Sequence, residues 1–89
     1  MPIRRADWDD VVEAFSRFFQ GRGEVLARGD EIEFRASVTG LSLRRDGTSR
    51  SFMPLHELGA RWDEVEFDSS GGEVRLRGSQ VTYTYRLPG

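Results

Sequence analysis

The sequence predicts an α+β fold in which an N-terminal amphipathic helix packs on an antiparallel, up-and-down β-sheet of about seven strands. Three observations predict it: one helical stripe of apolar residues near the N-terminus, short alternating segments after it, and turn dipeptides between those segments. The chain has 89 residues and contains no linker or low-complexity tract. We therefore expect a single domain over residues 1–89, near the lower size limit for a chain with one core.

The helix is predicted over residues 7–21, DWDDVVEAFSRFFQG. Asp7 is the expected N-cap, and Gly21 can end the helix in the left-handed conformation. Glu13 and Arg17 are four residues apart on the polar side, where they form a favourable pair. The apolar side predicts that the helix covers a sheet, and it consists of Trp8, Val11, Val12, Ala14, Phe15, Phe18 and Phe19.

The first hairpin is predicted over residues 24–35, with Gly29-Asp30 as a two-residue turn. The tripeptide Arg-Gly-Asp at 28–30, which also occurs in ligands of adhesion receptors, is therefore interpreted as a hairpin tip. The turn separates an apolar face from a charged face. The facing pairs are Val25–Phe34 and Ala27–Ile32 on the apolar face, and Glu24–Arg35 and Arg28–Glu31 on the other.

The next two turns are predicted at Thr39-Gly40 and Asp46-Gly47. The first would fold Ile32, Phe34, Ala36 and Val38 back onto Leu41 and Leu43, and would place Arg35 opposite Arg44. The second would place Leu41 opposite Phe52.

The segment Pro54 to Gly59, PLHELG, is predicted as one helical turn with proline at its start and glycine at its end. The sheet either continues past this turn or bends or splits near residues 54–59. A strand over 62–68, a loop over 69–72 and a strand over 73–77 follow. The pairs expected there are Phe67–Val74, Val65–Leu76, Glu66–Arg75 and Glu64–Arg77.

The last turn is predicted at Gly78-Ser79, which would pair Leu76 with Val81 and Val74 with Tyr83. Tyr83 and Tyr85 are then expected on the core face.

Composition excludes several kinds of chemistry. The chain has no cysteine, and its 13 basic residues are all arginine. Disulfides, thiolate metal sites, a cysteine nucleophile, Schiff-base lysine and a P-loop lysine are therefore excluded. A single histidine, His56, excludes multi-histidine metal sites, and we expect no metal and no cofactor. No apolar run is long enough to span a membrane and the N-terminus has no apolar signal core, which predicts a cytoplasmic protein without membrane partners.

The sequence favours a non-enzymatic protein, although His56 next to Glu57, Asp63 or Glu64 would be the general-base candidate of an enzyme. The alternating carboxylates Glu64, Glu66 and Asp68 are interpreted as partners of arginines across the ladder and not as a metal site.

The leading hypothesis is an interaction module that binds itself as a homodimer, or binds another protein. Leu26 and Trp62 are apolar residues that the predicted pairing leaves on the solvent face, and Trp8 is a third candidate contact. The C-terminal strand VTYTYRL would also leave an adhesive edge, unless Arg86 and Pro88 blunt it.

The alternative is a nucleic-acid-binding module. Its candidate residues surround the 44–50 hairpin: Arg35, Arg44, Arg45 and Arg50. The net charge of −2 favours neither hypothesis. They differ in whether these arginines form an uninterrupted patch or are neutralised by Glu31, Glu33 and Asp46.

Overall fold

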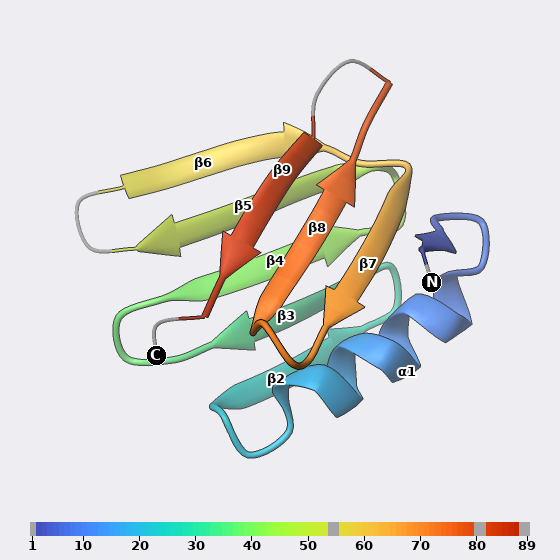
Figure 1. Ribbon diagram of the computed structural model, residues 1–89. Helices are drawn as coiled ribbons and strands as arrows, with labels where there is room; N and C mark the ends of the chain where they lie inside the picture. Colours follow the sequence, from blue (N-terminus) through green and yellow to red (C-terminus); the bar gives the residue numbers. More distant parts are fainter. Residues whose placement is uncertain (1, 54–55, 80–81, 88–89) are drawn as a thin grey trace.

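The computed structural model describes residues 2–53, 56–79 and 82–87 and consists of one helix packed on two antiparallel sheets (Figure 1). The predicted α+β class is confirmed. The four-stranded sheet has the order β1 (Ile3–Arg4), β7 (Glu64–Asp68), β8 (Glu73–Arg77) and β9 (Thr82–Arg86). The five-stranded sheet follows chain order: β2 (Glu24–Arg28), β3 (Glu31–Arg35), β4 (Gly40–Arg44), β5 (Thr48–Met53) and β6 (His56–Arg61).

The helix α1 spans Trp8–Phe19, inside the predicted range. Asp7 occupies the N-cap position, but its carboxylate makes no capping hydrogen bond; its backbone oxygen accepts instead from the amides of Asp10 and Val11. Beyond the helix, Gly21 has the expected positive φ of 78°. Within the described residues, no helix is both long enough and apolar enough to cross a membrane.

The helix closes one side of the two-sheet sandwich. It lies against β1 and β7 of one sheet and against β2 and β3 of the other (Figure 1). Phe15 and Phe18 contact Phe67 of β7, whereas Phe19 stacks on Phe34 of β3 with ring centroids 4.1 Å apart. The apolar stripe of α1 therefore joins both sheets into one core.

Two hairpins have the predicted pairing. In β2–β3, Val25 faces Phe34 and Ala27 faces Ile32. The pairing of β7 with β8 is also as predicted, and the loop at 69–72 connects them. In both hairpins the turn residues determined which strand positions face each other.

The β3–β4 hairpin differs from the prediction. Residues 36–39 form a four-residue loop, closed by a hydrogen bond of 2.9 Å from the Ala36 amide to the Thr39 oxygen. Phe34 therefore faces Leu41. Val38, expected on the apolar face, lies in this loop and is 53% exposed.

The β4–β5 hairpin is displaced by one residue. Its loop has three residues, 45–47, because Gly47 adopts a positive φ of 99°. Leu41 therefore faces Ser51 and not Phe52. A displacement of one residue exchanges the two faces of a strand, and Ser49 and Ser51 are accordingly buried.

The predicted helical turn at Pro54–Gly59 is wrong. Residues 54–55 lie outside the described residues, and His56–Arg61 form strand β6, which pairs with β5. The sheet does split, but at Trp62 and Asp63, just beyond residues 54–59. The strands β1 and β6 account for the difference from the expected number.

The β8–β9 pairing is displaced by two residues, so that Leu76 faces Tyr83 and Val74 faces Tyr85. Val81, the expected partner of Leu76, lies outside the described residues. An even displacement preserves the faces, and both tyrosines still point toward the core as predicted.

Candidate functional site

Three arginines of the predicted patch, Arg35, Arg44 and Arg50, lie on the outer face of the five-stranded sheet, whereas Arg45 lies in the β4–β5 turn and points toward the N-terminal end of α1. The side chains are exposed and extend from β3 through β4 and its turn to β5, in the order Arg35, Arg44, Arg45 and Arg50. The expectation that Arg35 faces Arg44 is wrong, because the loop at 36–39 shifts the pairing. Arg44 faces Glu31, and Arg35 faces Gly40. The like-charge contact that motivated an anion site is therefore not formed between these two residues.

Carboxylates interrupt the patch. Arg44 Nε lies 3.3 Å from Glu31 Oε2, and Arg35 Nη2 lies 3.2 Å from Glu33 Oε1. Exposed pairs of this kind add little stability, but they reduce the local positive potential. A phosphate backbone would meet alternating charges at these strands and not a continuous cationic surface.

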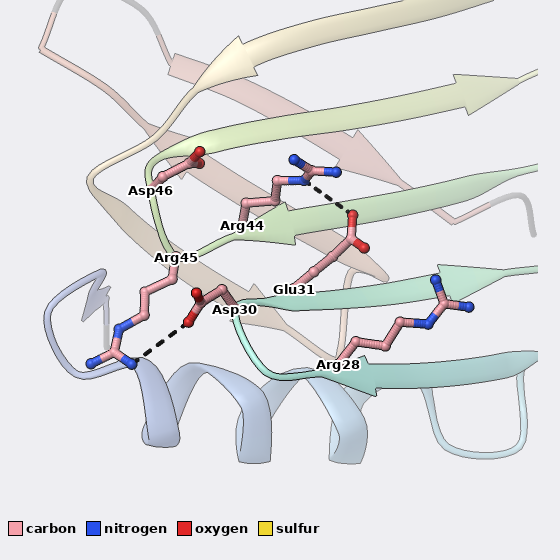
Figure 2. Close-up of a pocket in the computed structure, with 6 residues that line it drawn as sticks. All are labelled: Arg28, Asp30, Glu31, Arg44, Arg45 and Asp46. Carbon is pink, nitrogen blue, oxygen red and sulfur yellow. Dashed lines mark hydrogen bonds and ion pairs between the residues drawn. The ribbon is translucent and has the colours of Figure 1, made fainter.

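An open depression of about 470 Å³ lies at the end of the patch, next to the β2–β3 and β4–β5 turns (Figure 2). Arg45 Nη1 is 3.9 Å from Asp30 Oδ1 within it, whereas Arg28 forms no ion pair with the described residues. Hydrogen bonds from the side chain and the amide of Thr48 lower the pKa of Asp46. The lining balances three cations with three anions: Arg28, Asp30, Glu31, Arg44, Arg45 and Asp46.

The expectation that Trp62 lies on the solvent face is wrong. Its side chain is 1% exposed, and its indole Nε1 donates to the Thr48 backbone oxygen at 3.1 Å. The sequence predicts Trp62 at the start of a strand over 62–68, but β7 begins at Glu64, and Trp62 lies in the link between the sheets, where its ring turns inward. Trp8 is buried too, with its Nε1 donating to the Gly29 oxygen at 3.0 Å, and the two rings lie 6.4 Å apart. Both tryptophans belong to the core.

Leu26 is the remaining apolar candidate. It faces Glu33 on the outer side of β2 and β3 and is half-buried. This is the face that the sequence predicted for it. A single half-buried leucine among charged residues is a small apolar contact area.

The outermost strand of the four-stranded sheet, β9, is another candidate surface (Figure 1). Its tyrosines are fixed inside the molecule. Tyr83 Oη lies 2.7 Å from Ser51 Oγ, and Tyr85 Oη lies 2.6 Å from Thr39 Oγ1. These bonds hold β9 across the other sheet while its far edge remains without a neighbouring strand in the described part of the chain. The aromatic C-terminal segment was the sequence signal for this edge.

His56 and the alternating carboxylates of the sequence lie on β6 and β7. His56 begins β6, facing Met53, and its side chain lies outside the described part of the structure. On the outer face of β7, Glu66 and Asp68 lie 3.2 Å and 3.3 Å from the guanidinium nitrogens of Arg75 on β8. These two carboxylates therefore form the cross-strand ion pairs that the sequence predicted.

No protein-family model, no curated protein and no solved structure matches this chain. The geometry of its surfaces is consequently the basis on which a function can be argued.

Proposed function

We propose that the protein is a cytoplasmic, non-enzymatic interaction module that associates with itself. The free edge of β9 is the observation that supports this proposal. In the described part of the chain, β9 has β8 as its one neighbouring strand, and its residues Thr82, Thr84 and Arg86 are exposed. An edge strand presents unpaired backbone donors and acceptors, which another strand can satisfy.

The edge strands β1 and β2 are less suited to pairing than β9, whereas β6, at the far edge of the five-stranded sheet, also has a single neighbouring strand in the described part of the chain. The strand β1 contains two residues, Ile3 and Arg4, which is too short to form a ladder of its own. The edge strand β2 carries Glu24 and Arg28 at its ends and lies beside α1. Charged residues and a covering helix are common means of protecting an edge.

Sedimentation velocity of the full chain, from micromolar to millimolar concentration, tests the proposal. We expect the mean mass to rise from that of a monomer toward that of a dimer. The substitution Leu26→Glu serves as a comparison, because it changes the outer face of β2 and leaves β9 intact. A wild-type chain that stays monomeric throughout this range would overturn the proposal.

A nucleic-acid-binding module remains the second candidate, and the observation in its favour is Arg28. Arg28 is exposed, lines the same depression as Arg44 and Arg45 (Figure 2), and has no ion-pair partner among the described residues. Fluorescence titration with single- and double-stranded nucleic acid at several salt concentrations distinguishes the candidates. Binding that weakens steeply with salt, and is lost in the double variant Arg44→Ala/Arg45→Ala, would favour the second candidate. The absence of binding at low salt would exclude it.

A further inference from the structure

The pairing of β9 with β8 determines which backbone amide and carbonyl groups of β9 point to β8 and which point to the free edge. The Leu87 amide donates to the Gly72 oxygen at 2.9 Å, which extends the alignment in which Tyr85 faces Val74. Hydrogen-bonded and non-hydrogen-bonded pairs alternate along an antiparallel ladder. Counting from Leu87, the backbone groups of Tyr85 and Tyr83 point to β8. Those of the three alternate residues point to the free edge: Thr82, Thr84 and Arg86.

The same three residues put a single charged side chain, at the end of the strand, on this edge. Their side chains lie on the exposed outer face, because Tyr83 and Tyr85 occupy the inner face. The only charged residue of the strand is Arg86, and its Nη2 is 2.6 Å from Glu73 Oε2 on the neighbouring strand. Inward-pointing charges and prolines usually protect an edge, and residues 82–86 contain neither.

We infer that β9 pairs antiparallel with β9 of a second copy of this chain, with Thr84 of each copy opposite Thr84 of the other. This inference rests on the proposed self-association and adds its interface. Two four-stranded sheets would then join into one continuous sheet across a two-fold axis. The arrangement is self-complementary, because the same edge serves both copies.

The alignment on Thr84 follows from the length and charge of the strand. Thr84 is the middle residue of β9, so this alignment places every edge-directed residue opposite another one. Thr84 of one copy faces Thr84 of the other, and Thr82 of each copy faces Arg86 of the other. A shift of two residues in either direction leaves one edge-directed residue of β9 without a partner inside the strand. Centring the pair on Arg86 instead would place two like charges opposite each other, which destabilises a ladder.

The absence of native cysteine allows a direct test by disulfide trapping of the full chain. In the inferred dimer, Thr84→Cys places two Cα atoms about 5.5 Å apart, within the range that a disulfide spans. Thr82→Cys is the matched control, since residue 82 is equally exposed on the same strand. Its two copies would be separated by four residues along the ladder, or about 14 Å, which is too far for a disulfide.

Each variant would be oxidised at a concentration where sedimentation detects the wild-type dimer, and analysed on non-reducing gels. We expect Thr84→Cys to form a covalent dimer rapidly and Thr82→Cys to remain largely uncrosslinked. Equal crosslinking of both variants, or none in Thr84→Cys while the wild type is dimeric, would overturn the inferred interface but leave self-association standing. A wild type that is monomeric by sedimentation would overturn both.

Discussion

The hydroxyl group of Tyr85 connects the two sheets through its hydrogen bond with Thr39. Tyr85 is fully buried, and its bond to Thr39 crosses the interior between β9 and the β3–β4 loop. Removing the hydroxyl by Tyr85→Phe takes one hydrogen bond from the buried Thr39. We expect the free energy of unfolding to fall by roughly 1–3 kcal/mol, measured by urea denaturation. Tyr83→Phe should cost less because Tyr83 is only half-buried, and equal losses would contradict this account.

The stability of the protein at alkaline pH depends on the same residue. Burial raises the pKa of Tyr85 above the ordinary tyrosine value, and the hydrogen bond with Thr39 opposes this rise only in part. A raised folded-state pKa gives stability that is present below the unfolded value of about 10 and is lost as the pH rises through the folded one. The free energy of unfolding should therefore begin to fall above a pH of about 10, and it should fall less steeply in Tyr85→Phe. Parallel curves for the two proteins would refute the prediction.

Trp62 and Leu26 provide a further contrast between single residues. Trp62→Ala should lower the free energy of unfolding by about 3–5 kcal/mol, because it removes a fully buried ring and its hydrogen bond to Thr48. Such a loss is a large part of the total stability of a small domain. Leu26→Ala, at a half-buried position on the outer face, should cost far less. Thermal denaturation followed by circular dichroism measures both, and similar midpoints would contradict the assignment of Trp62 to the core.

At the scale of elements, Gly47 determines the β4–β5 hairpin. Its φ of 99° lies in the region that other residues rarely adopt, and an added Cβ would lie 2.9 Å from Arg61 Nη2. We expect Gly47→Ala to destabilise the protein by about 1–2 kcal/mol in urea denaturation. Gly29→Asn is the control, because Gly29 has φ of 51° in open space and asparagine tolerates that conformation. A Gly47→Ala variant as stable as this control would show that the hairpin does not need glycine there.

The hairpins also show how far the sequence determines the pairing of strands. The β2–β3 and β7–β8 hairpins were predicted correctly because charge pairs and apolar pairs both agreed with the loop length. The predicted pairing of the β4–β5 hairpin was wrong by one residue: it placed Phe52 opposite Leu41, where the structure has Ser51. Ser51 is buried, and its hydroxyl group finds a hydrogen-bond partner in Tyr83 of a distant strand. Such a long-range partner cannot be found from alternation within one segment.

For the whole molecule, the sequence predicted a helix on a sheet that could bend or split near residues 54–59, and the structure has two sheets with the helix closing one side. What was wrong is the helical turn that proline and glycine suggested there, and the assignment of Trp62 to the strand that follows. The side chain of Trp62 instead enters the core as the chain passes from one sheet to the other. The four arginines of the predicted patch are exposed, but the pairing of Arg44 with Glu31 depends on strand pairing that the β3–β4 loop alters.

The proposed self-association would make the stability of the whole molecule depend on its concentration. If folded chains dimerise and unfolded chains do not, mass action stabilises the folded state as concentration rises. Well above the dissociation constant, each tenfold increase in concentration should raise the melting temperature by about 3–6 °C. The variant Thr84→Arg should abolish this dependence, because it places two arginines directly opposite each other in the inferred dimer. Ser69→Arg adds the same charge in the exposed β7–β8 loop and should keep the wild-type dependence. Differential scanning calorimetry at several concentrations measures all three proteins, and a concentration dependence retained in Thr84→Arg would place the contact away from the middle of β9.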